Sequence, residues 1–176
     1  SYKTGECLMT TYSRGSIWRE WDLHVHTPYS FHWAGPKFEN DQDKVNALID
    51  QMIRSFNDAR PAAFAIMDYW HFDGWFGLKT RLKQYGAPQL EKTIFPGIEL
   101  RLAAPMKERL NAHVIFSDEI EDQDLKDFLS RLRLELIDKP LSTDALIEYA
   151  RRVAADKLQS HGFTKSKVLG DDSEAY

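Results

Sequence analysis

The sequence predicts one α/β domain built on a mostly parallel sheet. Short apolar runs, typical of buried strands, alternate along the chain with longer segments of helical periodicity. The 176 residues suffice for one domain with a sizeable core, and 43% hydrophobic and 28% charged residues are ordinary for a globular protein. In such folds, functional sites form at the carboxyl ends of the strands.

The expected strands and helices follow from these patterns. Four segments have the composition of strands: residues 21–26, 62–67, 93–100 and 111–116. Four others have apolar residues at helical spacing: residues 41–60, 76–85, 118–133 and 142–158. Asp41 or Asn40 is the expected N-cap of the first helix, which Pro61 ends. The aromatic segments 27–40 and 69–75 are expected to be loops.

The third and fourth strands are expected to pair directly. Pro96 and Gly97 are expected to interrupt the third strand, because both residue types are disfavoured inside strands. Only about ten residues lie between the two strands, fewer than a crossover with a helix usually needs. A direct return would bring His113 back near Glu99.

The composition limits the classes of function. A formal net charge of −4 gives no overall basic field for nucleic acid, although a local basic patch remains open. Cys7 is the only cysteine, so the chain can form neither an internal disulfide nor a cysteine-based zinc site. No apolar run approaches a membrane span and the first residues are polar, so we expect a cytoplasmic protein without membrane contact.

The histidines are concentrated near the amino terminus. Three of the six lie within nine residues, in the segment Trp-Asp-Leu-His-Val-His-Thr-Pro-Tyr-Ser-Phe-His. The first two are two residues apart, which places both side chains on one side of a strand, and imidazole is the commonest metal ligand. Carboxylates end two later apolar runs and are expected at the same edge of the sheet. The candidate metal ligands are His24, His26, His32, Asp68, Glu99 and His113.

This donor set indicates metal-assisted hydrolysis. Imidazole and carboxylate suit Zn, Mn or Fe better than Ca or Mg, and Glu99 among histidines can bridge two ions. Such ions generate hydroxide near neutral pH and neutralise phosphate oxygens, so no serine or cysteine nucleophile is needed. Arg101 follows Glu99 by two residues and faces the same side if the strand continues. There it would clamp a phosphate or, alternatively, form a surface salt bridge.

These residues resemble the motifs of the PHP (polymerase and histidinol phosphatase) domain. The matching motifs are His24-Val-His26 with His32, Ile66-Met-Asp68-Tyr69, Gly97-Ile-Glu99 and Asn111-Ala-His113. The resemblance implies a distorted, seven-stranded (β/α) barrel, of which this chain would hold an incomplete part, about the first half. It also implies a phosphate ester substrate and two or three divalent ions (Mn, Zn or Fe), with Glu99 as the bridging ligand.

A narrower resemblance concerns the PHP domains at the amino terminus of large bacterial SMC- or AAA-like ATPases. It rests on the opening Gly-Ser-Ile-Trp-Arg-Glu-Trp-Asp-Leu-His-Val-His-Thr-Pro, residues 15–28, and on Asp-Tyr-Trp-His-Phe-Asp-Gly, residues 68–74. It implies an ATPase module as partner, in the same longer chain or complex, because this chain has no Gly-x-x-x-x-Gly-Lys-Ser/Thr motif. It also implies nucleic acid as the substrate.

Two departures separate the chain from the family pattern. The family's second-motif histidine is Tyr69 here, and His71 either compensates as a ligand or forms a hydrogen bond within the aromatic loop. The closing Asp-x-His of the family does not occur after residue 118. We therefore expect residues 19–165 to be a truncated phosphoesterase domain between an irregular arm, 1–18, and an acidic tail, 166–176, or a domain with a reduced metal site.

One main hypothesis of function follows, with two alternatives. The main hypothesis is a metal-dependent phosphodiesterase or nuclease module that works with an ATPase. The alternatives are a small-molecule phosphatase and a non-catalytic interaction or regulatory domain with an incomplete metal site.

Overall fold

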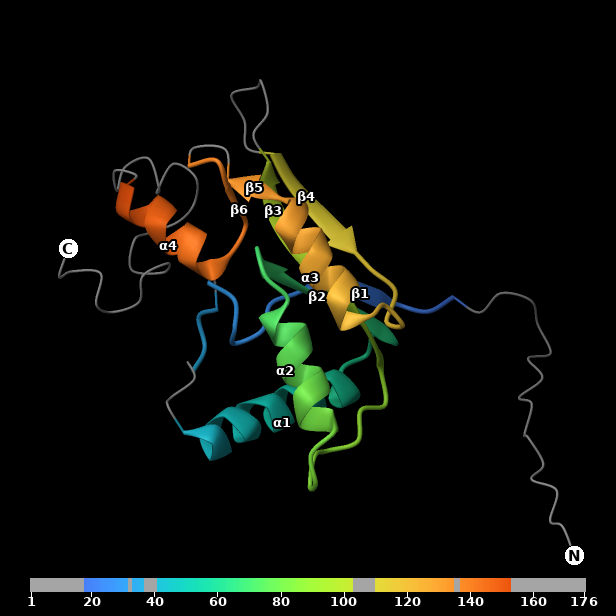
Figure 1. The fold of residues 1–176 in the computed structure, drawn as a ribbon. Helices are drawn as coiled ribbons and strands as arrows, with labels where there is room; N and C mark the ends of the chain where they lie inside the picture. The colour runs from blue at the N-terminus through green and yellow to red at the C-terminus, as the bar shows by residue number, and fades with distance from the viewer. Residues whose placement is uncertain (1–17, 32, 37–40, 103–109, 135–136, 153–176) are drawn as a thin grey trace, which may run out of the picture.

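A four-stranded sheet forms the centre of the molecule (Figure 1). The computed structural model describes residues 18–31, 33–36, 41–102, 110–134 and 137–152. In spatial order the strands are β1 (Trp21–Val25), β2 (Ala63–Tyr69), β3 (Thr93–Leu102) and β4 (Leu110–Ile115). The first three run parallel, and β4 returns antiparallel to β3. This arrangement confirms the predicted α/β class with a mostly parallel sheet, in the form of an incomplete barrel.

Helix α1 (Gln42–Asp58) begins and ends close to the predicted residues. The side chain of Asp41 caps its amino terminus by accepting hydrogen bonds from two backbone N–H groups of the first turn. One face of the helix is buried, at Ile49, Ile53 and Phe56. Phe56 meets Phe64 of β2 with ring centroids 4.9 Å apart, so this apolar face packs the helix onto the sheet.

The chain after β2 differs from the prediction in two ways. β2 continues to Tyr69, and α2 (Asp73–Leu82) begins inside the segment predicted to be a loop. Trp70 has a φ of 65°, a left-handed conformation that turns the chain sharply between strand and helix. The turn brings Phe72 and Trp75 into the core, where burial of their rings offsets the strain.

Strand β3 is uninterrupted, so the prediction for Pro96 and Gly97 is wrong. Both residues lie in register with β2, opposite Ile66 and Met67. The carbonyl of Pro96 accepts a hydrogen bond from Phe116, just beyond β4, so the missing N–H of Pro96 lies where the ladder with β4 ends. Gly97 allows close contact between the strands, because a Cβ there would lie 2.7 Å from the carbonyl oxygen of Ile66.

The carboxyl-terminal part adds two helices and a short hairpin. These elements are α3 (Asp122–Arg131), β5 (Arg133–Leu134), β6 (Lys139–Pro140) and α4 (Thr143–Arg152). α3 is shorter than predicted at both ends, and the hairpin has no counterpart in the prediction, because such short strands show no alternation. Within the described part of the chain, no helix combines the length and apolarity of a membrane span.

Aromatic packing holds α3 against the rest of the fold. Phe128 of α3 packs on Phe72, the N-cap residue of α2, and on Phe116, just beyond β4, with ring centroids 6.4 and 5.0 Å apart. Leu125, one turn earlier on α3, is fully buried. The core therefore extends from α1 and the sheet to α3.

Candidate metal centre

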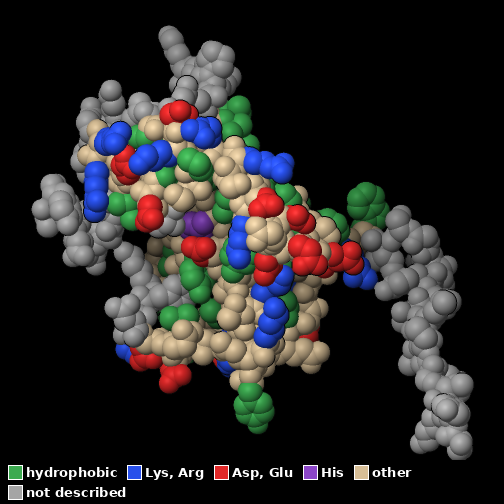
Figure 2. Space-filling view, in the orientation of Figure 1, with side chains coloured by type: hydrophobic (Ala, Val, Ile, Leu, Met, Phe, Trp, Pro, Cys, Tyr) green, Lys and Arg blue, Asp and Glu red, His purple; other side chains and the backbone are tan. Residues whose placement is uncertain are grey.

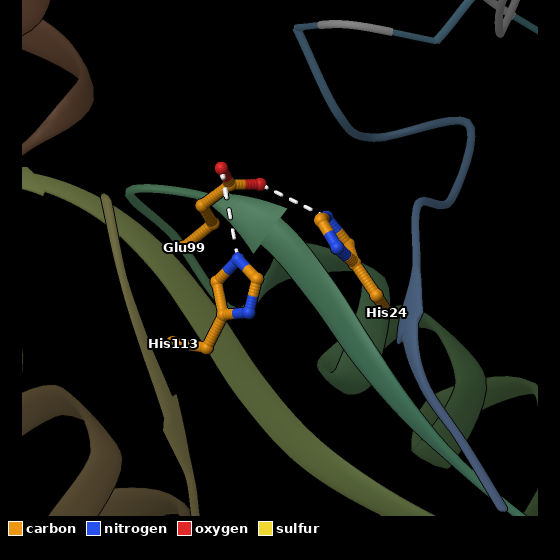
Figure 3. A group of neighbouring side chains, drawn as sticks. All are labelled: His24, Glu99 and His113. Carbon is orange, nitrogen blue, oxygen red and sulfur yellow. Dashed lines mark hydrogen bonds and ion pairs between the residues drawn. The ribbon is translucent and has the colours of Figure 1, made fainter. Parts of the chain in front are cut away.

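Two imidazoles, from His24 of β1 and His113 of β4, converge on the carboxylate of Glu99 of β3 (Figure 3). Glu99 of β3 lies in register with His113 of β4 on one side and with Tyr69 of β2 on the other. His24 comes from β1, the edge strand beyond β2. The predicted direct return of β4, which brings His113 to Glu99, is therefore confirmed.

His24, Glu99 and His113 each offer one ligand atom to the same small volume. Nε2 of His24 lies 3.1 Å from Oε2 of Glu99, and Nε2 of His113 lies 3.7 Å from Oε1. The three ligand atoms all lie within 4.8 Å of one another. Glu99 is buried, whereas both imidazoles are partly exposed, so the group is open to solvent on the side of the histidines.

The carboxylate of Glu99 is held in its ionised form. Burial alone would raise the pKa of Glu99, but the hydroxyl of Tyr69 and the imidazoles of His24 and His113 outweigh it, and the pKa lies below its usual value. Asn111 donates a hydrogen bond from Nδ2 to Oε1 at 2.7 Å. Glu99 is thus negative at neutral pH and fixed in orientation, as a metal ligand requires.

His26 lies at the edge of this group. Its Nε2 is 3.8 Å from Oε2 of Glu99, and its ring stacks on Tyr69 with centroids 5.3 Å apart and 14° between the planes. Its Nδ1 faces the opposite way, 3.3 Å from Oγ of Ser30 and 3.9 Å from Oδ1 of Asp68. His26 and His24 therefore approach the same oxygen of Glu99.

Asp68 is fully buried, and its carboxylate is already engaged by Thr27. One oxygen accepts the backbone N–H of Thr27 at 2.8 Å, and the other lies 2.5 Å from the Thr27 hydroxyl. Burial, opposed by these hydrogen bonds, raises the pKa of Asp68 to about 7. Asp68 lies on the Nδ1 side of His26, away from Glu99. The role of Asp68 as a metal ligand stays a prediction.

Arg101 lies beside the group, next to Tyr69. Its guanidinium carbon is 5.3 Å from the centroid of the Tyr69 ring, and Nη2 is 3.5 Å from the Tyr69 hydroxyl. Because β3 is continuous, Arg101 and Glu99 point to the same side of the strand. A positive charge thus lies next to the possible metal ligands, and the phosphate clamp stays a prediction.

His71 makes its contacts in the turn between β2 and α2. Its Nδ1 accepts the backbone N–H of Asp73 at 3.3 Å, and its ring meets Phe31 edge to face with centroids 5.4 Å apart. Burial lowers the pKa of His71, which leaves the ring neutral at neutral pH. These contacts are those of a hydrogen-bonding residue within the aromatic segment. His32 lies outside the described residues.

Three residues of the site were not among the candidates: Asn111, Thr27 and Trp70. Asn111 precedes His113 by two residues, and the alternation that pairs the first two histidines could have found it. Thr27 follows the second histidine, but its residue type alone does not predict a bond to a buried carboxylate. Trp70 donates its backbone N–H to the carbonyl of Glu99 at 3.3 Å in a left-handed conformation, which no sequence pattern indicates.

The donor set fits a divalent transition-metal ion. Two imidazoles and one carboxylate with an open position form the ligand set of many hydrolytic zinc sites, and Mn and Fe accept the same ligand types. Ligand atoms around a tetrahedral cation lie roughly 3.4 Å apart. The distances of 3.1 and 3.7 Å from Glu99 to the histidines bracket this value, and all three ligand atoms lie within 4.8 Å of one another. Among the residues that the structure describes, His24, Glu99 and His113 are the one such group.

Comparisons with known proteins give one weak structural likeness. No protein-family model matches the chain, and no curated protein matches it. Among solved structures, an amidohydrolase from Chromobacterium violaceum, with bound sulfate and no metal, aligns with a TM-score of 0.41 and 16% sequence identity. The alignment covers 84% of this chain and 41% of that one, so the chain spans less than half the length of the amidohydrolase. The resemblance to the PHP family stays a prediction.

Proposed function

We propose that the chain is a metal-dependent phosphoesterase module that binds one divalent cation at His24, Glu99 and His113. The supporting observation is the convergence of two imidazoles on a buried, ionised carboxylate, with a guanidinium group beside them. When bound, such a cation neutralises charge on a phosphate oxygen and lowers the pKa of water.

The residues of the chain would hold and orient the reacting groups. Glu99 supplies the negative charge for the cation, and Asn111 and Tyr69 keep its carboxylate in one orientation. Burial is the main cause that raises the pKa of Tyr69, so its hydroxyl stays protonated and able to donate. Arg101 would bind the phosphate oxygens of the substrate through its planar set of N–H donors.

Surface charge bears on the class of phosphate ester. Figure 2 shows Lys and Arg side chains gathered over α4 and the β5–β6 hairpin. Acidic neighbours pair with several of them, and the ion pairs are Arg133–Asp138, Lys139–Glu148 and Arg152–Glu148. Because three of these cations share two carboxylates, the pairs offset part of the positive charge that a nucleic-acid backbone would meet on the described part of this face.

We therefore propose a single phosphodiester as the substrate group, such as the end of a nucleic-acid strand. The ATPase module implied by the narrower resemblance is the proposed partner. Copurification of this module with the longest natural form of the protein tests that part of the proposal.

Hydrolysis of bis-para-nitrophenyl phosphate by the full chain tests the activity. With Mn, Zn or Fe(II) added, the wild-type chain is expected to release nitrophenol, and Glu99→Gln and His113→Ala are expected to abolish the release. Glu91→Gln is the matched control, because Glu91 is an exposed carboxylate outside the site. Arg101→Gln is expected to raise the KM for the diester, since Arg101 would contact the substrate.

Other outcomes of this assay would change the conclusion. Full activity in Glu99→Gln would remove the assigned site. Faster hydrolysis of para-nitrophenyl phosphate than of the diester would favour a small-molecule phosphatase. Wild-type chain that binds metal weakly and hydrolyses neither ester would favour the non-catalytic alternative.

A further inference from the structure

Thr27, Ser30 and Asp68 form a buried network behind His26, on the side away from Glu99. Thr27 and Asp68 are fully buried, and Ser30 is nearly so. The backbone N–H of Thr27 bonds to Oδ1 of Asp68 at 2.8 Å, and the Thr27 hydroxyl bonds to Oδ2 at 2.5 Å. Because two hydrogen bonds join the same two residues, neither side chain can rotate without breaking one of them.

Thr27 also organises the turn that follows it. Its Oγ1 accepts the backbone N–H of Tyr29 at 3.2 Å, and its carbonyl accepts the backbone N–H of Ser30 at 2.9 Å. These bonds place Oγ of Ser30 at 3.3 Å from Nδ1 of His26. A continuous series of hydrogen bonds therefore leads from Asp68 through Thr27 and Ser30 to His26.

Packing leaves this network little room to shift. A Cβ at Gly74, in the first turn of α2, would lie 2.3 Å from Oδ2 of Asp68 and 2.4 Å from Oγ1 of Thr27. The backbone of α2 therefore closes the network. On the other side, the stacked ring of Tyr69 restricts rotation of His26.

We propose that Asp68 is a positioning residue, which acts through Thr27 and Ser30 to hold His26 as its Nδ1–H tautomer, so that Nε2, 3.8 Å from Oε2 of Glu99, serves as an additional ligand of the proposed cation. Histidine ligands of metals usually donate their other N–H to an oxygen of the protein, and this fixes both the tautomer and the ring orientation. In this proposal Nδ1–H of His26 donates to Oγ of Ser30, which lies 3.3 Å away. The inference rests on the proposed metal site, and it gives Asp68 a role other than the direct ligand predicted from sequence.

Side-chain 1H–15N spectra of the metal-free chain test the inference without any metal. These spectra report the tautomer of each imidazole, and comparison with His26→Ala identifies the signals of His26. We expect the Nδ1–H tautomer in the wild type and in Thr27→Ser, which keeps the hydroxyl. Thr27→Val and Ser30→Ala are expected to give a mixture with the Nε2–H tautomer. The wild-type tautomer in both of these variants would overturn the inference.

Titration with cobalt(II) shows whether the network acts through His26. Thr27→Val is expected to weaken cobalt binding about 10- to 100-fold in the wild-type background. In a His26→Ala background the same substitution is expected to have no further effect. An equal loss in both backgrounds would contradict the inference, since the network would then support the fold in general. If the wild type binds no cobalt, the proposed function fails, while the tautomer of His26 still decides this inference.

Discussion

Ionisation of the buried Asp68 is expected to lower the free energy of unfolding as the pH rises from about 4 to about 7. In the folded protein its pKa rises from 3.8 to about 7, mainly through burial. Between these two values the folded chain keeps a proton that the unfolded chain releases, so a rising pH favours the unfolded chain. The stabilisation is complete below the unfolded pKa and is lost as the pH passes the folded pKa.

The substitution Asp68→Asn isolates this effect. An asparagine matches the protonated carboxyl, because its oxygen can accept the backbone N–H of Thr27 and its amide can donate to the Thr27 hydroxyl. One pKa unit corresponds to about 1.4 kcal/mol, so a pKa that rises from 3.8 to about 7 changes stability by about 4 kcal/mol. Between about pH 4 and pH 8, the free energy of unfolding of the wild type should therefore fall by about 4 kcal/mol more than that of Asp68→Asn.

Urea unfolding measures the free energy of unfolding of the wild type and of Asp68→Asn. It is monitored by tryptophan fluorescence at several pH values, with EDTA present. The two proteins share all other titrating groups, so the difference between them reports Asp68 alone. Parallel pH profiles would refute the reasoning, because they would mean that Asp68 has the same pKa in the folded and unfolded chains.

Three further predictions concern stability. Gly74→Ala should lower the free energy of unfolding by about 1–3 kcal/mol, because its Cβ meets buried groups at 2.3 and 2.4 Å, and an unchanged urea midpoint would contradict this. Ile53→Ala should cost about 2–5 kcal/mol, because Ile53 is fully buried, and a smaller loss in urea unfolding would mean that the core refills the space. Zinc at about 100 times its Kd should raise the free energy of unfolding by about 2.7 kcal/mol in the wild type and much less in Glu99→Gln.

The regular elements could be predicted where local pattern decides the structure. The cap at Asp41 and the apolar spacing that follows it determine α1, and burial of the run before Asp68 determines β2. Pairing with β2, rather than residue preference, carries β3 across Pro96. Likewise, α2 begins at Asp73 because a left-handed turn at Trp70 brings aromatic rings into the core.

Alternation and chain length were enough to predict the central part of the site. They predicted that His24 and His26 lie on one side of the chain and that β4 brings His113 back to Glu99. Glu99 and Asp68 both follow apolar runs, so these patterns could not tell which of the two carboxylates faces the imidazoles. Glu99 faces two partly exposed imidazoles, whereas Asp68 is held by Thr27. That difference depends on the geometry of the turn after β1, which residue spacing does not reveal.

Zinc binding at His24, Glu99 and His113 is tested most directly by equilibrium dialysis of the metal-free chain, with bound zinc measured by elemental analysis. We predict one zinc ion per wild-type chain, and no comparable binding in the triple variant His24→Ala/Glu99→Gln/His113→Ala. Equal binding by the two proteins, or no binding by a folded wild-type chain, would contradict the assignment of the metal centre.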